Sequence, residues 1–245
     1  MPSSPALETF PRPGVTVDLA ILTVVGASDI SPSLRLLVQD RAEPAGRALP
    51  GGFMRERWTV ARTVDDVLRR KVGIEPSSAI KPRLLRVFDD PDRDDRTWAL
   101  SVAHSVSLRE TDLAHALGDL VRVTPEGGLD AEPPLLFDHD QIVAAAVTSV
   151  RERYEFRYRY VDTYPAPDGF LSEPFTLHQL RKVHEAVVGA ELHKDNFTRR
   201  MKPYLQPVLR AGKPVLSDGL RGRPAALWRR LTAEPDRGLR VPPGV

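Results

Sequence analysis

The sequence predicts a mixed α/β domain followed by a smaller winged helix-turn-helix domain. Strand-like runs and amphipathic helices alternate up to about residue 155, and short capped helices follow the Pro- and Gly-containing stretch PAPDGFLSEP at 165–174. The charge changes at the same place. Residues 175–245 carry 14 lysines and arginines against 6 aspartates and glutamates, whereas the preceding residues carry 21 against 27. A basic second domain beside an acidic first domain indicates that one of them meets a polyanion.

We expect five segments along the 245 residues. They are a loosely ordered N-terminus at 1–13, the α/β domain at 14–155, a linker at 156–174, the winged helix-turn-helix domain at 175–235 and a tail at 236–245. There are no cysteines, which excludes disulfides and cysteine-ligated metals. The longest apolar runs fall far short of the roughly 20 residues that a membrane helix needs. A signal-peptide pattern is also missing, so the sequence predicts a cytoplasmic protein with no membrane partner.

The elements of the first domain can be read in order. Val15–Gly26 (VTVDLAILTVVG) is β-branched and almost continuously apolar, as a buried central strand is. Leu34–Val38 is its expected hairpin partner, and Gly51-Gly52 marks a later turn. The remaining expected elements are a helix at 60–72, strands at 81–88, 97–107 and 121–124, and a helix from about 138 to 153.

The stretch LPGGFMRERWTVARTVDDVLRRKVGI at 49–74 combines a glycine turn, a loop and an amphipathic helix that Gly73 ends. One face of this helix collects Val60, Val64, Val67 and Leu68. The entry, the exit and the spacing from Gly52 to Gly73 resemble a Nudix box, the loop and helix that bind divalent metal on diphosphate substrates. The order of elements is consistent with a Nudix-like α/β/α sandwich.

The chemistry of the box departs from that pattern. Trp58, Val67, Arg70 and Lys71 stand where the family has glutamates, and Asp66 stands at its arginine position. Because magnesium prefers carboxylate oxygens, we expect no metal, no cofactor and no catalytic residue, and therefore no enzyme. The alternative is a hydrolase of ADP-ribose-like nucleotide diphosphates that uses a shifted carboxylate set. That set would be recruited from Glu56, Asp66 and the aspartates at 92–95.

An acidic loop follows the second half of the sheet. FDDPDRDDR at 88–96, with Ser101-Val102-Ala103 behind it, looks like the loop and strand of ADP-ribose-type Nudix proteins. A solvated acidic turn is the other interpretation. The histidines of this domain, His104, His115 and His139, are interpreted as surface or structural residues, because no metal-binding spacing surrounds them.

The second domain begins with two short helices. Thr176 and Gln179 form a capping-box pattern for the first helix, and Asp195 is the expected cap of the second, which Pro203 should end near Lys202. Phe197 and Met201 should pack inward. A short second helix with cationic and amide side chains facing outward is typical of a recognition helix in a major groove.

A hairpin is expected after these helices. Val208–Leu216 and Arg221–Leu231 would pair around Ser217-Asp218-Gly219 and form a wing, with Arg229 and Arg230 on or beside it. A helical bundle with a solvated charged face is the alternative. DNA is favoured, and the candidate DNA-binding residues are Lys194, Asn196, Thr198, Arg199, Arg200, Lys202, Arg221 and Arg223.

The segment Arg151–Tyr164 (RERYEFRYRYVDTY) alternates basic with aromatic residues. The pattern fits a strand or the frayed end of the preceding helix, and the sequence does not decide between them. Such a surface could stack on bases or form an interdomain or dimer interface, which we favour.

The stretches FTLHQLRKVHEAVVGAELHKDNFTRRM and GRPAALWR strongly resemble the winged-helix domain of the NrtR family of Nudix-related transcriptional regulators. The resemblance implies a homodimeric repressor of NAD-biosynthesis or salvage genes, bound to a palindromic operator and loosened by ADP-ribose or a related NAD metabolite. It places effector contacts at Gly51, Gly52, Arg70, Lys71, Asp92 and Arg93. The box has fewer glutamates than in some relatives. A protein-interaction adaptor without DNA affinity is the third hypothesis.

Overall fold

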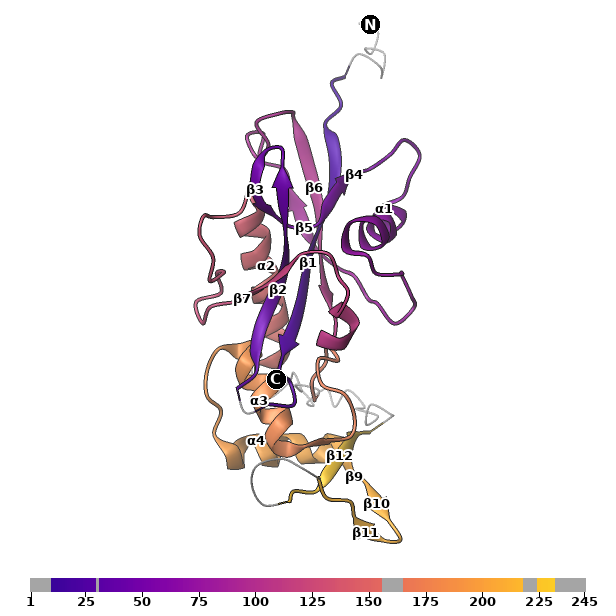
Figure 1. The fold of residues 1–245 in the computed structure, drawn as a ribbon, viewed down its shortest axis with the longest axis vertical. Helices are drawn as coiled ribbons and strands as arrows, with labels where there is room; N and C mark the ends of the chain where they lie inside the picture. The colour runs from indigo at the N-terminus through magenta and orange to yellow at the C-terminus, as the bar shows by residue number, and fades with distance from the viewer. Residues whose placement is uncertain (1–9, 30, 156–164, 218–223, 232–245) are drawn as a thin grey trace, which may run out of the picture. The chain divides into compact units, whose positions relative to one another are not determined.

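The computed structural model describes residues 10–29, 31–155, 165–217 and 224–231. Two compact units are present (Figure 1). The first comprises the chain up to Leu22 together with Arg35–Ser149, and the second comprises Thr23–Leu34 and the chain from Val150 onward. Within the described part of the chain, none of the helices combines the length and the apolar character that crossing a bilayer requires.

The first unit is built on a seven-stranded sheet with the order β3-β2-β1-β6-β5, in which β4 also pairs with β1 and β7 with β2. Only the β1–β6 pair of this sheet is parallel among the described strands. The central strand β1 is buried from Thr16 to Val24, in agreement with its continuous apolar pattern. The strands are β1 Gly14–Val25, β2 Ser33–Ala42, β3 Ala45–Ala48, β4 Gly51–Phe53, β5 Arg83–Phe88, β6 Ala99–Ser107 and β7 Asp119–Arg122.

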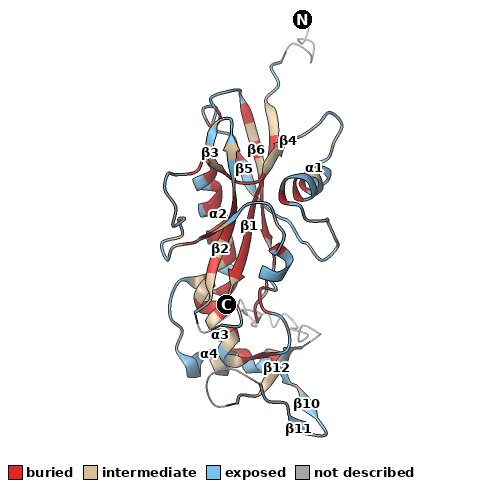
Figure 2. Ribbon diagram, viewed as in Figure 1, coloured by how far each residue is buried: buried red, intermediate tan, exposed pale blue. Residues whose placement is uncertain are grey.

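Helices cover both faces of this sheet, which makes the expected α/β/α sandwich (Figures 1 and 2). Helix α1 (Val60–Val67) continues as the π-helix η2 (Leu68–Val72) and ends at Gly73 in the left-handed conformation, φ 79°. Its predicted apolar face packs on Val17, Leu19 and other core residues. Helix α2 (His139–Tyr154) lies on the opposite face, and a 3-10 turn, η3 (Glu110–Leu113), precedes β7.

The second unit holds a three-stranded sheet, β8-β12-β9, beside two helices. Thr176 caps the first helix with the predicted Thr176–Gln179 capping box. The second helix begins two residues earlier than predicted, because the amide of Phe197 donates to the carbonyl of His193 and places Asp195 inside the first turn. The elements are β8 Phe175–Thr176, α3 Leu177–Val188, α4 Lys194–Met201, η4 Lys202–Tyr204, β9 Leu205–Pro207, β10 Leu209–Arg210, β11 Lys213–Pro214 and β12 Leu227–Arg230.

The predicted single strand Val208–Leu216 was wrong. Its two halves, β10 and β11, pair with each other across Ala211 and Gly212, whose φ angles of 49° and 76° make the tight turn. Leu216 then bridges to Ala226, so a second, outer pairing remains as expected. Of the basic–aromatic segment, the described residues up to Tyr154 belong to α2, and 156–164 lie outside the described residues, as do 1–9 and the tail from 232.

His184 lies at the centre of the second unit. Its side chain is fully buried, its ring meets Tyr154 and Phe197 edge-on at 4.7 and 5.1 Å between centroids, and its Nε2 accepts from the Ala166 amide at 3.2 Å. Burial, aided by the charge of Arg230, lowers the pKa of His184 from its ordinary 6.5 to about 3. The folded unit therefore holds a neutral imidazole at physiological pH.

We expect acid to destabilise the second unit through this histidine. Because the unfolded chain protonates His184 near pH 6.5 and the folded chain does not, the stabilisation is complete above pH 6.5 and is lost as the pH falls toward 3. The free energy of unfolding should decrease by about 1.4 kcal/mol per pH unit in that window. Urea unfolding of His184→Gln, which keeps an acceptor but does not titrate there, should show a flatter pH dependence than wild type. The exposed His193→Gln is the control, and equal slopes in all three proteins would refute the assignment.

Candidate functional site

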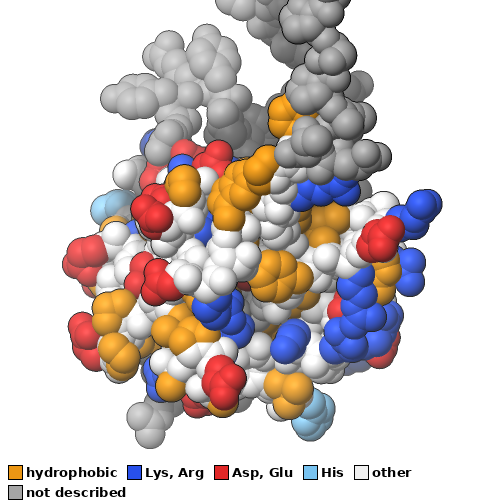
Figure 3. Space-filling model, turned by 90° about the horizontal axis from the view of Figure 1, so that it is seen from above, with side chains coloured by type: hydrophobic (Ala, Val, Ile, Leu, Met, Phe, Trp, Pro, Cys, Tyr) orange, Lys and Arg blue, Asp and Glu red, His pale blue; other side chains and the backbone are white. Residues whose placement is uncertain are grey.

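A cavity of about 370 Å³ opens in the first unit between β4, the helix α1–η2 and the acidic loop, and we call it the cationic pocket. Seen from above, Lys and Arg side chains gather on the same side of the molecule as α1 (Figure 3). The pocket lining contains five of the six predicted effector residues, Gly51, Gly52, Arg70, Lys71 and Arg93. The sixth, Asp92, lines a neighbouring cavity of about 410 Å³ that is rich in aspartates. The predicted residues thus surround two adjoining cavities that share Arg93, Asp94, Arg96 and Phe137.

Arg93 is a scaffold residue as much as a pocket residue. Its guanidinium is buried and donates to both carboxylate oxygens of Asp138 at 2.9 and 2.6 Å, and Asp18 lies 3.5 Å away. Burial alone would lower the pKa of Arg93, but the hydrogen bond and charge of Asp138 raise it above the ordinary value. Since two carboxylates neutralise this cation, little of its charge remains for a ligand.

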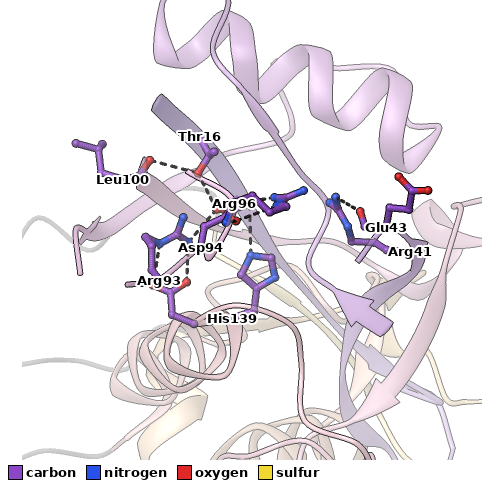
Figure 4. A network of polar contacts seen from close by, with 10 residues as sticks. Thr16, Arg41, Glu43, Arg93, Asp94, Arg96, Leu100 and His139 are labelled. Carbon is purple, nitrogen blue, oxygen red and sulfur yellow. Dashed lines mark hydrogen bonds and ion pairs between the residues drawn. The ribbon is translucent and has the colours of Figure 1, made fainter. Parts of the chain in front are cut away.

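Asp94 and Arg96 form the wall between the two cavities. Arg96 donates to both oxygens of Asp94 at 2.8 and 2.7 Å, and this hydrogen bonding keeps the pKa of Asp94 below its ordinary value (Figure 4). The guanidinium of Arg96 lies 4.9 Å from the ring centroid of Phe137, and that of Arg41 lies 5.5 Å from it. Phe137 adopts a left-handed φ of 62°, which is uncommon for an aromatic residue and holds its ring at the junction of the cavities.

His139 has structural partners on both sides of its ring. Its Nδ1 accepts from the Leu49 amide at 2.9 Å, and its Nε2 lies 3.6 Å from Asp18. Burial lowers the pKa of His139, although Asp18 and Asp138 oppose the shift. A neutral imidazole that accepts at Nδ1 carries its proton at Nε2, toward Asp18. These contacts agree with the interpretation of His139 as a structural residue.

The six cations of the pocket differ in whether a carboxylate holds them. Arg70 pairs with Asp66 at 3.1 Å, Arg93 with Asp138, and Arg96 with Asp94. Among the described residues, no carboxylate forms an ion pair with Lys71, Arg41 or Arg55. The sequence drew no attention to Arg41 and Arg55, because Arg41 stands in an apparently polar loop and no motif marks Arg55. No group of three or more histidines and carboxylates suited to a metal ion occurs in the described ranges.

The second unit presents a cationic surface on α4. Phe197 and Met201 are buried, as predicted, and the predicted outward residues Lys194, Asn196, Arg199, Arg200 and Lys202 are exposed, with Thr198 half-buried. Arg199 donates to the Asn196 side chain at 3.2 Å, which orders the two groups next to each other. Five of the six predicted side chains on this helix and its end are therefore exposed to solvent.

The basic side chains that the wing exposes are not all the ones that the sequence predicted. Arg210 and Lys213, which no sequence motif marks, flank the exposed β10–β11 turn. Arg230 instead points into its own unit, where it donates to Glu173 at 2.9 Å and to the carbonyls of Pro165 and Leu171 at 2.8 and 3.0 Å. The predicted contacts Arg221 and Arg223 lie outside the described residues.

Known proteins share both parts of this architecture. The family model of the NrtR DNA-binding winged helix domain matches residues 169–229. The chain is 28% identical over 202 residues to the ADPR responsive transcriptional repressor NtrR of Acinetobacter baylyi, covering 78% of this chain and 73% of that protein. Shewanella oneidensis NrtR complexed with a 27mer DNA superposes with a TM-score of 0.66 at 25% identity, over 89% of this chain and 93% of that one. A MutT/nudix family protein from Enterococcus faecalis has the same fold, with a TM-score of 0.64 at 22% identity over 92% and 90% of the two chains.

The two glycines of the pocket should respond differently to alanine. A Cβ on Gly51 would overlap the Asp18 side chain, whereas a Cβ on Gly52 would meet Val67 at an ordinary 3.6 Å. Gly51→Ala should therefore lower the free energy of unfolding by about 1–3 kcal/mol, because a buried ionic network must shift. Gly52→Ala should leave it nearly unchanged. Urea unfolding followed by circular dichroism measures both, and equal losses would contradict the role assigned to Asp18.

Proposed function

We propose that this chain is a member of the NrtR family of Nudix-related transcriptional regulators and a repressor that binds duplex DNA through α4 and the wing. The observation that carries the proposal is the exposed cationic face of α4 inside the segment that matches the NrtR winged-helix family. We further propose that it acts in the cytoplasm as a homodimer on a palindromic operator of NAD-biosynthesis or salvage genes. The domain boundaries 14–155 and 175–235 belong to this proposal.

The division of labour on DNA follows from the side chains. Lys194 and Asn196 lie in the first turn of α4, where a recognition helix meets base edges, and we assign them base or nearby backbone contacts. Arg199, Arg200 and Lys202 neutralise phosphates, together with Arg210 and Lys213 at the tip of the wing. The DNA complex of the Shewanella oneidensis relative supports DNA as the partner.

We propose that the effector is ADP-ribose or a related NAD metabolite, bound in the cationic pocket of the first unit. The Acinetobacter baylyi relative, described as ADPR responsive, supports this assignment. A diphosphate is a dianion that suits a pocket with more cations than carboxylates. To loosen the repressor from DNA, the effector must bind the DNA-incompetent arrangement more tightly than the competent one.

We propose that the first unit has no hydrolase activity. A shifted carboxylate set would have to draw on Glu56, Asp66 and the acidic loop. Glu56 is exposed beside Arg57 at 3.8 Å, Asp66 is paired with Arg70, and Asp94 is paired with Arg96. Each of these three carboxylates has an arginine beside it, and the described residues contain no group of three or more side chains suited to a metal ion, so the regulator is favoured over the hydrolase.

The DNA assignment predicts that alanine variants of the phosphate-binding arginines bind DNA with a weaker salt dependence. Arg199→Ala and Arg210→Ala should each weaken binding and lower the slope of log K against log salt by about 0.9, because each removes one phosphate contact. Fluorescence anisotropy with duplexes from the intergenic regions beside the protein's own gene measures the slope. Arg69→Ala, on the first unit and paired with Glu75, is the control and should keep the wild-type slope. An unchanged slope for Arg199→Ala would remove α4 from the interface.

The effector assignment predicts release from the same duplex. Saturating ADP-ribose should raise the Kd for DNA by about 5- to 150-fold, the usual range of coupling between sites. Tight DNA binding whose Kd does not change with ADP-ribose would support the regulator assignment and refute ADP-ribose as the effector. Release of AMP and ribose 5-phosphate from ADP-ribose in the presence of magnesium would favour the hydrolase instead.

A further inference from the structure

The carboxylates that line the cationic pocket are all engaged by the protein itself. Asp66 is held by Arg70, Asp94 by both donors of Arg96, and Asp18 by the hydroxyl of Thr16 at 3.1 Å and by Arg93 at 3.5 Å. Magnesium requires several oxygen ligands in near-octahedral geometry. The donor set of this pocket does not fit a divalent ion, because each of the three carboxylates already has an arginine partner.

The cations of the pocket outnumber these carboxylates. Six lysines and arginines line it against three aspartates. Three of the six, Arg41, Arg55 and Lys71, have no carboxylate ion pair among the described residues. The pocket therefore keeps a positive potential in its own right, and this potential suits a ligand that carries about two negative charges.

Arg41 carries an unsatisfied donor at this place. Its Nε is buried and has no hydrogen-bond partner in the described part of the protein, while its Nη2 donates to the Glu43 carbonyl at 3.1 Å (Figure 4). Leaving a charged donor buried without an acceptor costs free energy, which an incoming oxygen acceptor would relieve. Arg41 also lies with Lys71 on an adjoining cavity of about 260 Å³, so both cations reach one continuous depression.

The other two cations are held in place by neighbouring groups. Arg55 lies 4.7 Å from the ring of Trp58, which Arg62 also contacts at 4.3 Å. The carbonyl of Lys71 accepts from Gln39 at 2.6 Å, and Gln39 also donates to Leu117 at 2.8 Å, which fixes the backbone of the π-helix. Trp58 and Lys71 both occupy former glutamate positions of the box. At these two positions, where the family has metal-binding glutamates, Trp58 holds Arg55 in place and Lys71 supplies a positive charge.

We propose that the pocket binds the diphosphate of its nucleotide effector as a metal-free dianion, with Arg41 and Lys71 as its main ligands and Arg55 at the rim, and that magnesium opposes this binding. The inference rests on the proposed effector function of the same pocket. Magnesium on the diphosphate would cancel the charge that these side chains recognise and would bring a divalent cation among three like charges. The ligand class is therefore a nucleoside diphosphate sugar free of metal.

Isothermal titration of the full chain with ADP-ribose tests this, once in EDTA and once in excess magnesium chloride at equal ionic strength. We expect tighter binding in EDTA. Binding that requires magnesium, or is equally tight in both, would overturn the inference and leave the effector assignment intact. Absence of ADP-ribose binding in both buffers would overturn the effector assignment and the inference with it.

Variants on the same protein identify the ligands. Arg41→Gln and Lys71→Gln should each weaken ADP-ribose binding in EDTA by about ten-fold or more, as expected for the loss of a charge-assisted hydrogen bond. In both variants the affinity for ADP-ribose should also differ less between EDTA and magnesium chloride than it does in the wild type. Arg69→Gln removes a cation from the same helix that is paired with Glu75 and does not line the pocket, so it should bind as wild type does. Wild-type affinity for Lys71→Gln, whose exposed side chain leaves the fold intact, would overturn the proposal even if Arg41→Gln unfolds.

Discussion

The buried guanidinium of Arg93 holds the first unit's pocket together. It joins the acidic loop to Asp138 at the start of α2 and to Asp18 on the central strand β1. Removing one partner from such a pair typically costs about 3–5 kcal/mol, because the remaining charge stays buried without compensation. The loop, the helix and the strand are therefore fixed relative to one another by one residue.

Several constraints follow from the position of Asp18. Its carboxylate occupies the space that a side chain at position 51 would need, which explains the first glycine of the Gly-Gly pair without any ligand. Asp18 also faces Nε2 of His139, whose Nδ1 accepts from Leu49 in the chain before β4. Gly51, which lies in β4 and not in the predicted turn, and His139, which was interpreted as a surface or structural residue, thus both pack on the carboxylate of Asp18 in one buried polar network. Arg93 belongs to the same network, and two carboxylates neutralise its charge. Other cations of the pocket must therefore bind the proposed ligand.

Local patterns in the sequence predicted the elements, and residues that act over long distances were missed. The valine spacing of α1, its end at Gly73 and the Thr176–Gln179 capping box depend on neighbours within a few positions, so the sequence contains the whole signal. The role of Arg41 depends on residues far away in the sequence, such as Phe137 and Lys71, beside which β2 places it. No local sequence pattern indicates these neighbours. The Ala211-Gly212 turn was missed because an alanine there adopts a left-handed φ, which propensity does not predict. Arg230 looked like a wing residue until its partners Glu173, Pro165 and Leu171 were known.

The proposed absence of metal chemistry and the proposed binding of a nucleotide rest on the same residues of the pocket. A glutamate at position 70 or 71 would help to hold a metal ion that activates water, whereas Arg70 and Lys71 cannot ligate a metal ion and instead attract the diphosphate or neutralise a neighbouring carboxylate. Binding the substrate without stabilising its transition state lengthens the life of the complex and leaves the ligand intact. An intact ligand reports its own concentration, which a hydrolysed one does not. The proposed sensor role and the proposed absence of hydrolysis therefore have the same physical basis, which is the set of cations in this pocket.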